Sequence, residues 1–160
     1  MTVSINHAKR ALFFFIAFLL MVTPVLTGIG PVVKAAESQA EDLFFSEYIE
    51  GSSNNKAIEI YNGTGSAVDL SGYVVELYTN SSTTVGQSLS LEGTLENNDV
   101  YVIGNSQAGD AVKSKADKTS AVTNFNGDDA VVLKKNNVII DVIHTVGTTE
   151  KILENITLVK

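Results

Sequence analysis

The chain has 160 residues, a net charge of −7 and no cysteine. Without thiols it can form no disulfide framework, no thiolate metal site and no cysteine nucleophile. Its acidic balance opposes the neutralisation of phosphates that drives nonspecific nucleic-acid binding, so we do not expect nucleic acid to be a partner of this domain alone.

The first 35 residues have the pattern of a secretory signal peptide. Lys9 and Arg10 precede an uncharged run, 11–33, and Val33-Lys34-Ala35 suits cleavage before Ala36. The uncharged run is long enough to be an uncleaved membrane anchor, but the prolines and glycines in its second half disfavour one long helix. We therefore expect a secreted or cell-surface protein of a Gram-positive bacterium, with no stable membrane span after cleavage. Cleavage would leave eight basic residues against all 18 acidic ones.

Residues 36–42 form a short polar and acidic linker, which we expect to be disordered, and residues 43–160 form one folded domain. Alternating apolar residues and turn-forming residues predict strands over 45–49, 56–61, 73–78, 87–95, 99–103, 128–141 (a hairpin) and 156–160. The one helix candidate is 108–116. Roughly eight short strands with turns about every ten residues predict an all-β fold, an immunoglobulin-like β-sandwich.

The clearest local pattern is Asn136-Asn137 between two apolar runs. Asparagine accepts the positive φ that a two-residue hairpin turn requires. Such a turn sets the pairing, and the expected pairs are Leu133–Ile140, Val131–Val142 and Asp129–His144. The four apolar residues among these would then share one face of the sheet.

Two carboxylates on the first two strands are candidates for chemistry. Strict alternation places Glu47 on the same face as Phe45, so we expect it to be interior and hydrogen-bonded to the backbone or to Asn62. Glu59 is expected nearer solvent. A general acid–base pair is the alternative interpretation of the two glutamates.

The segments Phe45-Ser46-Glu47, 58–62, 69–73, 126–133 and 140–143 occur in an order and spacing that resemble the lamin tail domain. The resemblance covers about 43–147. The residues that carry it are Ser46, Glu47, Glu59, Asn62, Asp69, Gly72, Gly127, Asp128 and Asp129. It implies an immunoglobulin-like sandwich, non-catalytic binding in animal lamins and, in bacteria, secreted proteins that often carry nuclease or phosphatase domains.

The chain departs from that family pattern near its end. His144-Thr145 stands where bacterial members commonly have glycine, and 148–160 lacks a loop with proline and tryptophan. Two interpretations of function stay open. The chain is a binding or positioning module for a protein, cell-envelope or polysaccharide partner, or it is the leading accessory domain of a longer secreted nuclease or phosphatase.

No set of residues in the sequence indicates catalysis. His144 is the only histidine after the signal segment, so every general-base scheme needs it, with Asp129 as its orienting partner; we favour a surface charge pair instead. Asp128 and Asp129, with Asp110 or Asp117, are a calcium alternative to a solvated turn, and we otherwise expect no cofactor. The tyrosines are core residues or a binding platform: Tyr48, Tyr61, Tyr73, Tyr78 and Tyr101.

Overall fold

The computed structural model describes residues 39–151 and 157–160. The chain divides into the units Met1–Glu37 and Ser38–Lys160, and all described residues belong to the second. The expected signal peptide, 1–35, lies outside the described residues. No helix within the described part of the chain is long and apolar enough to cross a membrane.

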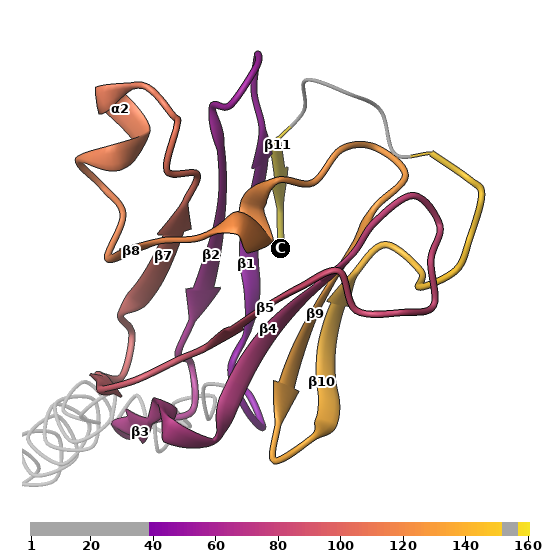
Figure 1. Ribbon diagram of the computed structural model, residues 1–160. Helices are drawn as coiled ribbons and strands as arrows, with labels where there is room; N and C mark the ends of the chain where they lie inside the picture. The colour runs from indigo at the N-terminus through magenta and orange to yellow at the C-terminus, as the bar shows by residue number, and fades with distance from the viewer. Residues whose placement is uncertain (1–38, 152–156) are drawn as a thin grey trace, which may run out of the picture. The chain divides into compact units, whose positions relative to one another are not determined.

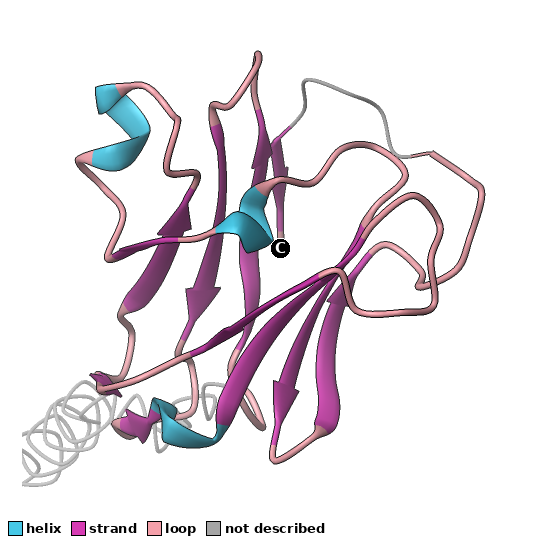
Figure 2. Ribbon diagram, in the orientation of Figure 1, coloured by secondary structure: helices cyan, strands magenta, loops and turns pink. Residues whose placement is uncertain are grey.

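The described unit consists almost entirely of short strands (Figures 1 and 2). The strands are β1 (Phe44–Glu50), β2 (Lys56–Tyr61), β3 (Val68–Asp69), β4 (Tyr73–Tyr78), β5 (Gln87–Ser90), β6 (Thr94–Leu95), β7 (Val100–Gly104), β8 (Lys118–Thr119), β9 (Ala130–Lys135), β10 (Val138–Ile143) and β11 (Thr157–Val159). The helical turns are η1 (Leu70–Gly72), α2 (Asp110–Lys113) and η2 (Ala121–Thr123).

The strands form two main sheets. One has the order β11-β1-β2-β7-β8, the other has the order β10-β9-β4-β5, and β3 pairs with β6 as a small separate ladder. All pairings are antiparallel except that between β7 and β8. The expected β-sandwich of immunoglobulin type is confirmed.

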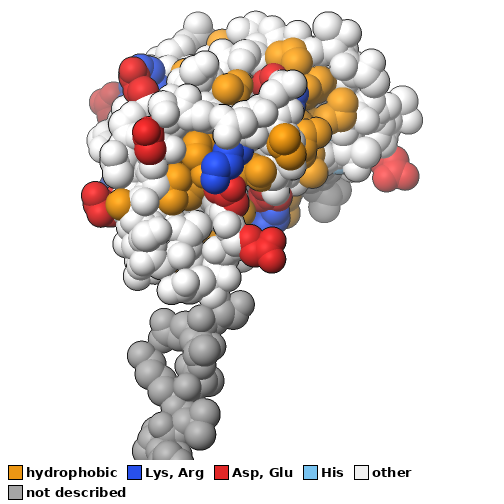
Figure 3. Space-filling model, turned by 90° about the horizontal axis from the view of Figure 1, so that it is seen from below, with side chains coloured by type: hydrophobic (Ala, Val, Ile, Leu, Met, Phe, Trp, Pro, Cys, Tyr) orange, Lys and Arg blue, Asp and Glu red, His pale blue; other side chains and the backbone are white. Residues whose placement is uncertain are grey.

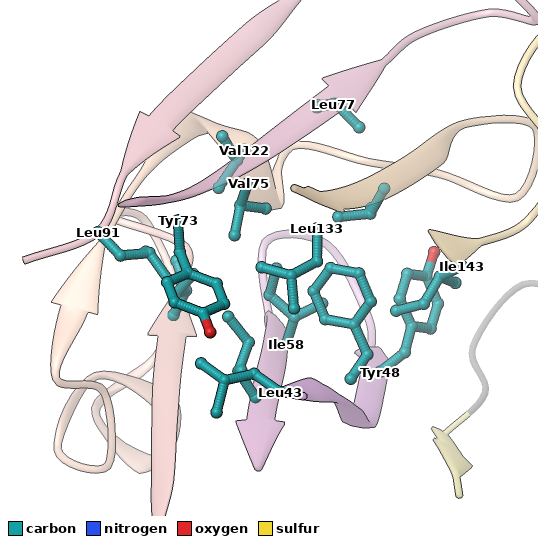
Figure 4. Close-up of a cluster of buried hydrophobic side chains, with 14 of the residues drawn as sticks. Leu43, Tyr48, Ile58, Tyr73, Val75, Leu77, Leu91, Val122, Leu133 and Ile143 are labelled. Carbon is teal, nitrogen blue, oxygen red and sulfur yellow. The ribbon is translucent and has the colours of Figure 1, made fainter. Parts of the chain in front are cut away.

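The hydrophobic core lies between the two main sheets. Its members alternate along the strands, and Figure 4 shows side chains of both sheets pointing toward one another. The largest fully buried side chains are Tyr48, Tyr73, Phe45, Phe125, Leu43, Ile58, Ile60, Leu70, Leu77, Ile103, Leu133 and Val75. Burying such side chains supplies the main stabilising free energy of the fold, at about 1.5–3 kcal/mol for each large apolar side chain.

A β-bulge interrupts β1 and changes which residues face the core. The register with β2 shifts between Phe45 and Glu47, so Ser46 is the extra residue. Phe45 and Tyr48 are both buried as a result, whereas Glu47 turns to the opposite face. The expected strict alternation is therefore wrong: Glu47 does not share the face of Phe45 and is not interior.

A second bulge corrects the pairing expected for the hairpin of β9 and β10. Asn136 and Asn137 have φ of 48° and 67°, as the predicted two-residue turn requires. The register then shifts between Ile139 and Asp141. The expected pairs Leu133–Ile140, Val131–Val142 and Asp129–His144 are therefore wrong, because Leu133 pairs with Asp141 and Val131 pairs with Ile143. The inward residue is Ile143, and Val142 is 41% exposed.

The two bulges lie beside each other, because β1 of one sheet meets β10 of the other there. The carboxylate of Asp141 accepts a hydrogen bond from the backbone N–H of Phe45 at 2.9 Å. It also forms an ion pair with Lys160 at 2.7 Å. Asp141 thus connects β10 to β1 and to the residue that follows β11.

The end of the expected linker is ordered rather than disordered. The backbone N–H of Ala40 donates to the carbonyl of Gly63 at 3.0 Å, and Lys135 forms an ion pair with Asp42 at 2.8 Å. Tyr73 donates its hydroxyl to the same carboxylate. Burial by itself raises the pKa of Asp42, but these donors and the backbone N–H of Leu43 together hold that pKa below its usual value.

Two further sequence predictions need adjustment. The strand predicted over 87–95 is split into β5 and β6, because Gly93 adopts a φ of 92° and its carbonyl accepts a hydrogen bond from Leu70. The predicted helix at 108–116 is confirmed in a shorter form as α2.

Candidate binding groove

The outer face of the five-stranded sheet, which points away from the core, is the candidate functional site. Cross-strand pairing places Phe44 beside Tyr61, and Tyr61 beside Val100, along one end of this face. Ile49 and Ala57 are paired farther along the same strands. Most of these side chains are only half-buried, so the face presents an apolar floor that is partly open to solvent.

The segment that carries α2 forms one wall of a groove over this floor. A Cβ on Gly104 would lie 3.0 Å from the Cβ of Ala116 and 3.4 Å from Val112, so glycine allows the segment to lie directly on β7. Figure 1 shows α2 beside β7. The resulting outer groove has a volume of about 380 Å³, and its lining includes Val102, Val112 and Lys115.

Glu47 and Glu59 are the acidic residues of the outer groove. They are directly paired across β1 and β2, so both carboxylates lie on the outer face. Glu59 accepts a hydrogen bond from the hydroxyl of Ser46 at 2.7 Å. The carboxylate of Glu47 accepts no hydrogen bond and joins no ion pair among residues 39–151 and 157–160.

The other residues of the suggested family motif hold the fold together. Asn62 is fully buried, donates to the carbonyls of Ser66 and Leu95 at 2.8 Å each, and accepts from the backbone N–H of Thr64 at 3.1 Å. It therefore ties the end of β2 to two other segments and satisfies its own polar atoms.

Asp69 and Gly72 shape the turn before β4. Asp69 accepts a hydrogen bond from the backbone N–H of Ser71 at 2.9 Å, which caps η1, and this bond is the main reason that the pKa of Asp69 lies below its usual value. A Cβ on Gly72 would lie 2.8 Å from the side-chain oxygen of Asn136, so glycine lets the hairpin turn pack closely.

Asp129 is a structural anchor at the turn after Gly127. Its buried carboxylate accepts hydrogen bonds from the backbone N–H groups of Asn80 at 2.6 Å and Asn126 at 2.8 Å. Asp128 follows the buried Gly127 and is half-buried. The expected Asp129–His144 pair does not form, since the ring nitrogen of His144 contacts the carbonyl of Glu150 at 2.7 Å.

The proposed calcium ligands are used in other ways. Asp117 accepts a hydrogen bond from the backbone N–H of Val102, and Asp110 lies 3.8 Å from Lys113. Within the described residues, no three acidic or histidine side chains are grouped in a way that would hold a metal ion. The geometry therefore offers no support for the calcium alternative in this part of the chain.

The five tyrosines do not form a surface platform. Tyr48, Tyr73 and Tyr78 are buried, and only Tyr61 and Tyr101 are half-buried. Tyr48 stacks on a core phenylalanine, with ring centroids 4.4 Å apart, and burial raises its pKa. Core packing is the role of most of them.

Comparison with known families agrees with the geometry. A family model for the Lamin Tail Domain matches residues 36–148. The chain belongs to the lamin tail domain family. Among curated proteins, none was found to match the sequence of this chain. The matched range includes β1 to β10, and β11 lies outside it.

The sequence indicated the two glutamates of the outer groove but not the groove itself. Its wall forms because the α2 segment packs back onto β7, and Gly104 is the residue that allows this close approach. The bulge at Ser46 decides that Glu47 lines the groove, and no periodic pattern could reveal that bulge.

Proposed function

We propose that this lamin tail domain protein is a secreted, non-catalytic module that binds a partner protein or a cell-envelope component through the outer groove. The observation that carries the proposal is the half-exposed apolar floor of the groove beneath the α2 segment. Concave apolar surfaces with a few polar groups are the usual form of protein binding sites. The signal-like pattern of 1–35 supports secretion.

The binding surface can be tested by blocking the groove. Ala111 is an exposed residue of α2 that lines the groove, and Ala111→Trp would fill much of it. Ala121 is an exposed alanine of η2 outside the groove, so Ala121→Trp is the matched control. The purified chain and both variants would be tested against peptidoglycan, wall polysaccharides and a peptide library at physiological salt.

We expect Ala111→Trp to abolish binding that the wild type and Ala121→Trp both show. Equal binding by all three proteins would show that the groove is not the binding surface. Failure of the wild type to bind anything in the panel would contradict the proposal as a whole.

Secretion is tested separately by expressing the chain in a Gram-positive host. The protein recovered from the medium should have Ala36 as its N-terminal residue.

A further inference from the structure

The two glutamates of the outer groove belong to one row of residues that crosses four strands. The register pairs Val159 with Glu47, Glu47 with Glu59, and Glu59 with Val102. Residues paired in this way in antiparallel strands present their side chains on the same face. This acid row, Val159-Glu47-Glu59-Val102, therefore has two carboxylates in the middle and a valine at each end.

No lysine or arginine within 39–151 and 157–160 forms an ion pair with the acid row. Like charges directly opposite each other on a sheet are destabilising. Six ion pairs join described residues, and none of them includes Glu47 or Glu59. Lys115 lines the same groove but is not within ion-pair distance of either carboxylate. The only hydrogen bond to the two carboxylates from a described side chain is the one that Ser46 donates to Glu59.

We propose that the outer groove binds an arginine side chain of a partner protein, presented between apolar residues, with the guanidinium against Glu47 and Glu59. This inference rests on the proposed function, because it names the partner chemistry of that same groove. A guanidinium is planar and carries five N–H donors, so one group can donate to two adjacent carboxylates. The apolar neighbours of the arginine would contact Val102 at one end of the row and Val159 at the other.

The surroundings favour an arginine over a small cation. Two carboxylates supply fewer oxygens than the six to eight that calcium takes, and no third acidic side chain joins them among the described residues. The apolar floor of the groove adds contact area that only a side chain with an aliphatic stem can use. Val159 of β11 completes the row beside Glu47.

A peptide library tests the chemistry of the partner directly. The probes are short peptides with apolar residues on both sides of one fully randomised central position, selected on the purified full chain. We expect arginine to be enriched at the centre, with lysine second. Replacing arginine by the neutral isostere citrulline in a selected peptide should weaken binding by about tenfold or more.

The protein variants give the matching controls. Glu47→Gln and Glu59→Gln keep the size of the side chain and remove one charge each, so each should weaken the selected arginine peptide by about tenfold. Lys115→Gln removes a repelling charge from the same groove and should strengthen binding of the arginine peptide. Folding of each variant would be checked by its unfolding midpoint in urea.

The possible outcomes separate this inference from the proposed function. Uncharged peptides that bind and are blocked by Ala111→Trp would overturn the inference and leave the groove as a binding surface. Arginine peptides that bind Glu47→Gln and Glu59→Gln as well as wild type would also overturn the inference. Calcium that competes with the selected peptides would indicate a cation site instead and would overturn it too. Selection of no peptide would contradict both proposals.

Discussion

Asp141 gives the sharpest test of how the two sheets are joined. Its carboxylate accepts the backbone N–H of Phe45 at the bulge of β1, and it contacts the ammonium group of Lys160 at 2.7 and 2.8 Å. Asp141→Ala would leave the N–H of Phe45, a residue that is only 1% exposed, without its acceptor. An unpaired buried donor that has lost a charged partner costs about 1.5–3 kcal/mol.

The ion pair should contribute much less than that hydrogen bond. The side chain of Lys160 is 52% exposed, and exposed ion pairs contribute about 0–1 kcal/mol. Asp141→Ala should therefore reduce the free energy of unfolding by about 2–3 kcal/mol. Asp141→Asn keeps an oxygen acceptor for Phe45, so we expect a loss of about 1 kcal/mol. Lys160→Ala should cost less than about 1 kcal/mol.

Urea unfolding followed by circular dichroism measures these differences, provided that the slope of the unfolding free energy against urea concentration is the same for all variants. The order of destabilisation should be Asp141→Ala first, then Asp141→Asn, then Lys160→Ala. If Lys160→Ala were as damaging as Asp141→Ala, the ion pair and not the hydrogen bond to β1 would hold the sheets together. That result would refute the reasoning.

Three further predictions concern single residues of the core and of the hydrogen-bond network. Ile143→Ala should cost about 2–4 kcal/mol of unfolding free energy while Val142→Ala costs under about 0.5 kcal/mol, and the reverse order in urea titrations would contradict the shifted register. Asn62→Ala should destabilise by about 2–4 kcal/mol in the same assay, because buried carbonyls lose their donors; a change within error would contradict its anchoring role. The folded pKa of Asp42 lies below its unfolded value, so the stability that Asp42 contributes is present above about pH 4 and is lost as the pH falls through the folded pKa. Unfolding midpoints measured from about pH 6 to pH 3 should therefore fall more steeply for wild type than for Asp42→Asn, and equal slopes would refute this sign.

Exposed apolar side chains outside the groove gather on two of the edge strands, β10 and β11. Among the described residues, six large apolar side chains are exposed, and five of them lie on these strands: Val138, Ile139 and Val142 of β10, and Leu158 and Val159 of β11. Figure 3 shows apolar side chains at the surface in the view from below. Edge strands of this kind are prone to pair with other chains unless a bulge or a charge interrupts them. In β10, the bulge and the charge of Asp141 interrupt the edge and so disfavour pairing with another chain.

Much of this architecture could be predicted from the sequence because it depends on short-range patterns. Alternating apolar residues indicated the main strands, and Asn136-Asn137 indicated the hairpin turn, since asparagine tolerates the positive φ found there. The ordered segments from Phe45 to Ile143 indicated the lamin tail domain, which the family match confirms. The strand and turn signals each lie within a few neighbouring residues, and the family signal is the order of several such short segments along the chain.

The orientation of the residues in the candidate groove was decided by tertiary structure. Strict alternation predicts that Glu47 is interior, but the bulge at Ser46 reverses the faces after it, and a bulge depends on the partner strand rather than on local periodicity. The bulge after Ile139 similarly placed Ile143 in the core and left Val142 exposed. The sequence by itself therefore determined the family, the main strands and the presence of two glutamates. The bulge in the hairpin of β1 and β2 placed those glutamates side by side on the outer face. The apolar groove beside them also needs β7 and the α2 segment, which lie far from both glutamates along the chain, so only the tertiary structure could form it.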